Sequence, residues 1–310
     1  MDTSYELISL RTLVGDVLNE AFESHPNIFV IDSDLAGSTT SDKFQEKHPE
    51  HFIETGIAEQ NAMSIATGIA KEGGIPFYVN FAIFATGTVW TQLRQACYPN
   101  ANVKILATHP GMDGGFDGAT HHANEDIALT RAIPNLQVLV PANPDELRAA
   151  VLYAADHEGP VYIRCSRDVV PNLPMAQPYE VGSAVVDADT GSDFAIVYEG
   201  TAGDLARKSF AACEERGRHG VLLNVRSVKP LDAELIRSIA GRVECMVTIE
   251  NHSVIGGLGG AVAEAVCELL SHAPLHRVGV EDVFTESGPS DRVKEKYGLN
   301  VENVLAKLGF

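Results

Sequence analysis

The stretch from His51 to Gly74, HFIETGIAEQNAMSIATGIAKEGG, decides how this chain folds. Its first residues have the character of a short strand, and Gly56 permits a turn directly afterwards. Apolar residues then recur at helical spacing until the glycine pair at the end of the stretch. We therefore expect Glu59 to lie between the carboxyl end of a strand and the start of a helix, where open α/β sheets bind ligands. An acid near a helix start is also favoured without any function, because it faces the positive end of the helix dipole.

Strands and helices alternate along the rest of the chain. Strands are predicted near residues 28–31, 75–80, 103–107, 138–140, 160–164, 194–198, 221–225, 243–249 and 275–280. Helical periodicity separates most of them, which is typical of a mainly parallel sheet with helices on its faces. Three prolines between residues 171 and 178 mark a linker. The predicted fold is α/β, with two doubly wound domains at residues 1–170 and 183–310 joined by a linker at residues 171–182.

Composition and charge restrict which partners the chain can have. The 310 residues, 45% of them hydrophobic, suffice for two domains with sizeable cores. The formal net charge of −19 argues against nucleic acid or an anionic membrane as a partner, because neutralising phosphates requires lysine and arginine. Five scattered cysteines form no Cys-x-x-Cys pair, and no run of about 18 apolar residues is present to span a bilayer. We expect a soluble cytoplasmic protein without a structural metal site.

Two glycine-rich segments have more than one interpretation. Residues 108–122 contain four glycines without the Gly-Lys-Thr or Gly-Lys-Ser of a phosphate-binding loop. The same segment carries five side chains that could bind a metal, but no known ligand spacing relates them, so a metal cluster is the weaker interpretation. These side chains are His109, Asp113, Asp117, His121 and His122. Residues 255–260, IGGLGG, do not keep the Gly-x-Gly-x-x-Gly spacing of a dinucleotide site.

The residues around Glu59 carry a family resemblance. Gly56–Met63, GIAEQNAM, followed by Ala66–Ala70, ATGIA, resembles the pyrimidine-binding domain of transketolase and deoxyxylulose-phosphate synthase. In that superfamily a glutamate hydrogen-bonds the aminopyrimidine ring of thiamine diphosphate, so the resemblance implies that Glu59 binds and activates this cofactor. Phe84 matches the aromatic ring that stacks on the aminopyrimidine. The further cofactor-binding residues implied by the resemblance are Phe81, Asp34 and Leu35.

A second resemblance lies in the glycine-rich loop. Asp117–His121, DGATH, followed by Glu125–Leu129, EDIAL, resembles the active-site loop of transketolases. It implies that His109, Asp117 and His121 contact the hydroxyl groups of the substrate, its phosphate and the developing oxyanion, with His121 as a second catalytic residue. An arginine can meet a phosphate with two parallel hydrogen bonds. The residues that match sugar-phosphate positions of the family are Arg11, Ser38 and Arg167.

Three residues near the reacting end depart from the family's pattern. Phe116 stands where relatives usually carry an acid, His122 replaces a common glutamine, and Thr88 replaces a common arginine. Phe116 removes a charge and adds bulk at this end. We therefore expect transfer of a two-carbon ketol unit from a sugar with an anionic end, and the best donor need not be xylulose 5-phosphate.

The second half of the chain resembles the transketolase C-terminal domain, through Arg226–Asp232, RSVKPLD, and Glu250–Ser253, ENHS. That domain is chiefly structural, so we assign no catalysis to Glu250 or His252. Transketolases hold the cofactor's diphosphate through Mg2+ in another domain, which carries a Gly-Asp-Gly motif, and this sequence has none. The resemblance therefore implies the C-terminal subunit of a split transketolase. Its partner would be an N-terminal transketolase subunit that carries the Mg2+ ligands, in a heterotetramer with two copies of each subunit.

Two other functions fit the same layout. The beta subunit of a 2-oxo-acid dehydrogenase-type decarboxylase has the same two domains, but the loop at residues 117–121 and the arginines Arg11 and Arg167 argue against it. A non-catalytic regulatory homologue would bind a partner without turnover. The joint presence of Glu59, Phe84 and the same loop argues against that function.

Overall fold

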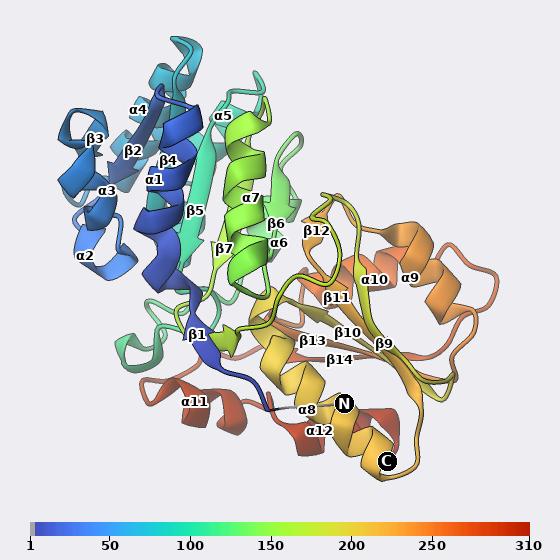
Figure 1. Ribbon diagram of the computed structural model, residues 1–310. Coiled ribbons are helices and arrows are strands. Elements are labelled where there is room, and N and C mark those ends of the chain that lie inside the picture. The colour runs from blue at the N-terminus through green and yellow to red at the C-terminus, as the bar shows by residue number, and fades with distance from the viewer. Residues whose placement is uncertain (1–3) are drawn as a thin grey trace.

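The larger of two main sheets has seven strands (Figure 1). The computed structural model describes residues 4–310. In spatial order the strands are β12-β6-β7-β5-β4-β2-β3, and every neighbouring pair is parallel except β12 with β6. The strands are β2 (Ile28–Asp32), β3 (Phe52–Glu54), β4 (Ile75–Phe81), β5 (Lys104–Thr108), β6 (Gln137–Leu139), β7 (Val161–Cys165) and β12 (Ser227–Lys229). This mainly parallel order confirms the predicted α/β class, and it places the carboxyl ends of six strands along one edge of the sheet.

The smaller sheet has five strands in the order β14-β13-β10-β11-β9. β9 runs antiparallel at one edge, and the other neighbouring pairs are parallel. The strands are β9 (Val185–Asp189), β10 (Phe194–Glu199), β11 (Gly220–Val225), β13 (Met246–Ser253) and β14 (Leu275–Val280). A short antiparallel pair, β1 (Leu7–Ser9) and β8 (Val169–Pro171), lies where the two halves of the molecule approach each other, and the sequence did not predict it (Figure 1).

Helices cover both faces of the larger sheet, because successive residues of a strand point to opposite faces. Phe77 of β4 belongs to the core under α1 and α7, whereas Tyr78 belongs to the core under α4 and α5. α7 begins as predicted, since Asn143 Oδ1 accepts a hydrogen bond from Glu146 N at 2.9 Å and Pro144 is the first helical residue. The helices of this half are α1 (Val14–Ser24), α2 (Ala36–Thr39), α3 (Asp42–Lys47), α4 (Glu59–Lys71), α5 (Trp90–Cys97), α6 (Asp126–Arg131) and α7 (Pro144–Asp156).

The smaller sheet is also covered on both faces, by α8 and α12 on one side and by α9 and α10 on the other. One hydrophobic core continues from Tyr78 and Leu93 of the larger sheet's half to Val197 and Leu258 of the smaller sheet's half. No helix within residues 4–310 is both long and apolar enough to cross a bilayer. The helices are α8 (Gly203–Glu215), α9 (Ala233–Ala240), α10 (Leu258–Val266), α11 (Ser290–Lys296) and α12 (Val301–Leu308), and short 3-10 helices occupy Leu10–Leu13, Pro49–His51, Gly115–Asp117 and Gly200–Ala202.

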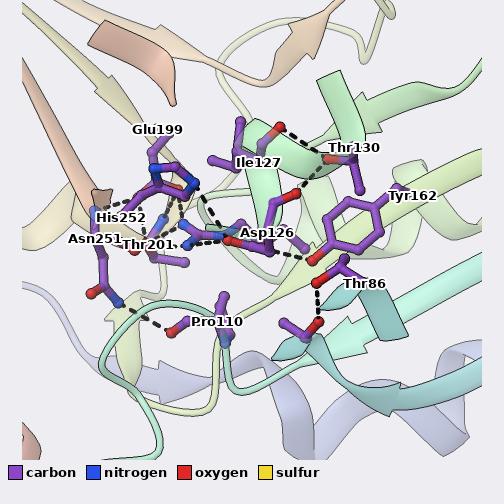
Figure 2. A network of polar contacts seen from close by, with 12 residues as sticks. Thr86, Pro110, Asp126, Ile127, Thr130, Tyr162, Glu199, Thr201, Asn251 and His252 are labelled. Carbon is purple, nitrogen blue, oxygen red and sulfur yellow. Dashed lines mark hydrogen bonds and ion pairs between the residues drawn. The ribbon is translucent and has the colours of Figure 1, made fainter. Parts of the chain in front are cut away.

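A buried ionic network joins the two sheets. Arg164 lies at the end of β7 with no solvent exposure, and its Nε is 2.9 Å from Asp126 Oδ2 while its Nη1 is 3.0 Å from Glu199 Oε2. Its Nη2 donates to Asn251 O at 2.7 Å, and Tyr162 OH donates to Asp126 Oδ2 at 2.6 Å. Figure 2 shows Asp126, Tyr162, Glu199 and Asn251 around this point. Because Asp126 belongs to the half with the larger sheet and Glu199 to the half with the smaller one, the network fixes how the two sheets meet.

Replacing Arg164 with methionine is expected to lower the free energy of unfolding by about 3–5 kcal/mol, because two buried carboxylates lose their partner. Urea denaturation of the purified chain, followed by circular dichroism, measures the change. Arg148→Gln is the matched control, since Arg148 pairs with Glu20 on the surface and exposed pairs contribute roughly 0–1 kcal/mol. Equally small changes in both variants would show that the buried network adds no stability.

Candidate active site

The turn before α4 presents Glu59. This residue is the first of the helix, and Gly56, with φ +63°, makes the turn that connects it to β3. Glu54 Oε1 accepts hydrogen bonds from Gly56 N at 2.7 Å and from Asp34 N at 2.9 Å, which ties this turn to the loop after β2. The Glu59 side chain is half-buried, and its carboxylate makes no hydrogen bond or ion pair with residues 4–310. It is therefore free to bond a ligand.

A buried acid, Asp32, organises the loop after β2. Its Oδ1 accepts a hydrogen bond from Leu35 N at 2.6 Å, and its Oδ2 accepts one from Ser41 Oγ at 3.1 Å. Burial raises the pKa of Asp32 to about 6. The loop holds Asp34 in a left-handed backbone conformation, φ +63°, which is uncommon for a residue other than glycine. Ser38 follows in α2, so three of the predicted site residues, Asp34, Leu35 and Ser38, share one short segment.

Four rings form a cluster at the carboxyl ends of β4 and β5. Phe81 and Phe84 are nearly parallel, with an interplanar angle of 13° and a centroid distance of 6.1 Å. The ring centroid of His109 lies 3.8 Å from that of Phe81, and His121 meets Phe84 edge-on at 5.3 Å and 81°. Phe84 also begins a π-helical turn, Phe84–Thr88, an element that occurs frequently at functional sites. The structure thus brings together four residues that the family resemblance predicted.

His109 is uncharged at neutral pH and has a strained backbone. Burial lowers its pKa to about 3, and the charges of Arg167 and Arg11 act in the same direction. Its Nδ1 atom lies 2.9 Å from Thr108 Oγ1. Its φ is +58°, and left-handed backbone at residues other than glycine costs free energy and occurs preferentially at active sites.

Arg11 and Arg167 line one cavity of about 770 Å³, which lies between the β1–β8 pair and helices α8, α11 and α12. Arg11 Nη1 donates to Ser38 O at 2.7 Å, and its buried Nε has no partner among residues 4–310. Burial and the positive charge of Arg167 lower the pKa of Arg11. Arg167 Nη1 donates to Asp113 O at 2.8 Å. The cavity thus contains two guanidinium groups, one with an unsatisfied buried N–H, in a chain of net charge −19, and acids such as Asp168 also line it.

The loop after β5 contains both exposed and buried residues. Asp117 and Phe116 are exposed, and the Asp117 carboxylate makes no hydrogen bond within residues 4–310. His122 is buried, with Nδ1 2.6 Å from Thr285 Oγ1 and Nε2 3.1 Å from Gly115 O, so it fastens this loop to the second half of the chain. In the described part of the chain no three His, Cys, Asp or Glu side chains are grouped so that they could hold a metal ion.

Three buried polar residues support the site, and the sequence did not assign this supporting role to them. Asp32 holds the loop after β2, and Asp113 and Asn251 hold the loop after β5. Asp113 Oδ1 accepts a hydrogen bond from Asn251 Nδ2 at 2.8 Å, and its Oδ2 accepts one from Arg167 N at 3.0 Å. An acid at or after the carboxyl end of a strand was the available signal for Asp32 and Asp113. Asn251 gave no comparable signal, because its partner Asp113 is 138 positions away in the sequence.

Comparison with known protein families covers almost the whole chain. The pattern of the transketolase pyrimidine binding domain matches residues 6–172, and that of the transketolase C-terminal domain matches residues 182–304. A transketolase C-terminal section from Methanocaldococcus jannaschii is 36% identical over 96% of this chain and 95% of its own length. The 6-deoxy-6-sulfo-D-fructose transketolase subunit of Clostridium sp. (strain MSTE9) is 35% identical over 96% of this chain and 92% of its own length.

The solved structures agree with these relatives. One described as a split gene transketolase, inactive beta4 tetramer, superposes on this chain with a TM-score of 0.87 and 41% sequence identity, and 97% of each chain is covered. Each of these two relatives therefore corresponds to almost the whole of this chain. The chain belongs to the transketolase family, and it corresponds to the section that a split transketolase carries as its C-terminal subunit.

Proposed function

We propose that this chain, together with an N-terminal transketolase subunit, transfers a two-carbon ketol unit between sugars with thiamine diphosphate as cofactor. The proposal rests on one observation, the free Glu59 carboxylate at the strand–helix junction beside an aromatic cluster. Gln60 Nε2 donates to Thr88 O at 3.1 Å, so the first turn of α4 lies against the π-helical turn that begins with Phe84. An acid and a flat apolar ring are the two groups that a bound aminopyrimidine requires, so the residues present fit the cofactor.

Thiamine diphosphate, when bound, supplies the nucleophilic carbon that carries the ketol unit. In our proposal Glu59 holds the proton that it shares with a ring nitrogen of the aminopyrimidine, and both carboxylate oxygens are available because no residue among 4–310 bonds them. Phe84 offers its face to the ring, and Phe81 packs behind it. Asp34 and Leu35 line the cofactor side of the loop after β2. The Mg2+ and diphosphate ligands are assigned to the partner, since this sequence has no Gly-Asp-Gly motif.

The substrate is proposed to lie between the ring cluster and the two arginines. Arg11 and Arg167 bind its anionic end, and Ser38 lies beside Arg11. His109 binds hydroxyl groups by hydrogen bonding alone, because its low pKa keeps it uncharged at neutral pH. His121, which touches Phe84, faces the reacting end and stabilises the developing oxyanion. Asp117, exposed in the same loop, is assigned to a substrate hydroxyl.

The proposed substrate class is a sugar with a terminal phosphate, and a terminal sulfonate is the second candidate. The relative from Clostridium is named for a sulfo-sugar, and a sulfonate offers a guanidinium the same kind of oxygen acceptors as a phosphate. Phe116, 70% exposed beside Asp117, is expected to set which sugars fit at the reacting end. The alternatives, a 2-oxo-acid dehydrogenase-type subunit and a non-catalytic homologue, gain no support from the site, because both arginines and the free acid are in place.

Alone, the chain is expected to be inactive, and ketol transfer should appear when an N-terminal transketolase subunit, thiamine diphosphate and Mg2+ are added. The solved relative described as an inactive beta4 tetramer supports the same expectation. Coupled assays of each subunit and of the mixture, with light scattering for the heterotetramer, test it. Turnover by the purified chain alone would refute the dependence on a partner.

Glu59→Gln in the assembled enzyme is expected to lower the rate by about 10²–10⁴-fold, because glutamine cannot hold the shared proton. The fold should survive, since no residue among 4–310 bonds this carboxylate. Exchange of the thiazolium proton, followed by NMR, and the steady-state rate give the two measurements. Glu72→Gln, in the exposed position after the same helix, is the control. Exchange at the wild-type rate in the Glu59 variant would remove this residue from the catalytic role.

Arg167→Ala is expected to reduce kcat/KM for a ketose phosphate roughly 10–100-fold, the loss typical of a hydrogen bond to a charged group. The value for the same ketose without phosphate should change little, because that substrate leaves Arg167 unused. Steady-state kinetics with both sugars measure the ratio. Arg292→Ala serves as the control, since Arg292 forms an exposed pair with Glu295. An equal loss for both sugars would mean that Arg167 does not recognise the phosphate.

A further inference from the structure

Among the side chains by which the second half of the chain contacts the active-site loop, Asn251 and Lys294 are the two that bond Asp113. Asn251 is buried in β13, and its Nδ2 donates to Asp113 Oδ1 at 2.8 Å while its Oδ1 accepts from Met112 N at 3.0 Å. The same Nδ2 lies 3.4 Å from Pro110 O, and Figure 2 shows these two residues facing each other. One side chain from the smaller sheet thus holds three positions of the loop after β5.

The backbone of that loop passes so close to Asn251 that a side chain is excluded. A Cβ atom on Gly111 would lie 2.1 Å from Asn251 O and 2.4 Å from the Asn251 side chain. Gly111 also has φ +56°, a conformation that glycine adopts without strain.

Lys294 of α11 holds the loop from the other side. Its Nζ lies 2.8 Å from Asp113 Oδ1 and 2.7 Å from Asp168 Oδ2. Burial disfavours the charge on Lys294, but the two carboxylates outweigh burial and raise its pKa above the ordinary value. Burial would by itself raise the pKa of Asp113, yet Lys294 holds the pKa of that carboxyl below its usual range. Lys294 and Asp113 are therefore both charged at neutral pH.

Asp113 transmits this restraint to Arg167. Its Oδ2 accepts a hydrogen bond from Arg167 N at 3.0 Å, and its carbonyl oxygen accepts one from Arg167 Nη1 at 2.8 Å. Ser9 Oγ donates to Arg167 O at 2.6 Å. One residue thus fixes both the backbone and the guanidinium of Arg167, and that residue is itself held by Asn251 and Lys294.

We infer that Asn251 and Lys294 are positioning residues for substrate recognition, because they hold Asp113 and Asp113 aims the Arg167 guanidinium at the anionic end of the sugar. This inference rests on the proposed function. It gives the second half of the chain a part in substrate selection, in addition to its structural part. The geometry also explains why an asparagine is suited to position 251, since its amide must donate to a carboxylate and accept from a main-chain N–H at once.

Lys294→Gln and Asn251→Ala, each assembled with the partner subunit, are expected to lower kcat/KM for a ketose phosphate roughly tenfold, within the range of coupling inside one hydrogen-bond network. The value for the same ketose without phosphate should stay within about twofold, because that sugar does not use Arg167. When Arg167→Ala is already present, neither change should further alter the ratio of kcat/KM for the ketose phosphate to kcat/KM for the unphosphorylated ketose. Hydrogen exchange of the isolated chain should rise at the Arg167 amide, which donates to Asp113 Oδ2, in both variants, and at the Met112 amide in Asn251→Ala.

Arg207→Gln is the matched control, because Arg207 forms a half-buried ion pair with Asp187 in the smaller sheet's half, 2.6 Å between Nη2 and Oδ2. It should lower the melting temperature and leave the ratio unchanged. Should Lys294→Gln fail to fold, Asn251→Ala decides, since it removes no charge. The inference is overturned if the wild type is active and the folded variants keep its ratio of kcat/KM for the ketose phosphate to kcat/KM for the unphosphorylated ketose. This holds whether both values stay the same or both fall equally. A wild-type complex without ketol transfer would instead overturn the proposed function.

Discussion

A fully buried guanidinium constrains the rest of the structure. A charge moved from water into a protein core is costly unless it is paired, and Arg164 obtains its two carboxylates, Asp126 and Glu199, from different halves of the molecule. Further donors of Arg164 reach the Thr201 hydroxyl and the carbonyl oxygen of Asn251. The two sheets therefore cannot separate or slide without leaving a buried charge unpaired. The position of Asn251 follows from this packing, and so does the course of the loop after β5.

Several acids near the site act on the backbone. Asp32, Glu54 and Asp113 each accept hydrogen bonds from main-chain N–H groups of neighbouring loops. Such bonds stabilise conformations that a loop would not keep by itself, including the left-handed backbone of Asp34, whose N–H donates to Glu54. The acids with protein partners thus shape the loops. Glu59 differs from them, because no residue among 4–310 occupies its carboxylate.

Local patterns in the sequence predicted the main strands and helices, including the start of α4 at Glu59, because periodicity depends only on near neighbours. The short strands β1, β8 and β12 were not predicted, because each pairs antiparallel with a segment far away in the sequence, which local patterns do not show. The ring cluster was predicted only through the family motif, since an aromatic residue after a strand is usually core. His122 illustrates what the motif could not supply. In the family pattern His122 replaces a common glutamine near the substrate. The position of its ring, however, depends on a bond to Thr285, 163 positions away in the sequence.

The pairing of β12 with β6 means that the two halves of this chain are not structurally independent, because both contribute strands to the larger sheet. β12 follows the proline-containing linker in the sequence, yet it completes the larger sheet as its edge strand. A chain cut at the linker would expose the backbone of β6, and an unpaired edge invites association with other chains. The larger sheet is therefore completed only by residues that are synthesised after the linker. Recombination between relatives at the linker would combine the β6 strand of one protein with the β12 strand of another. Recombination that transfers both halves together would keep the two strands matched.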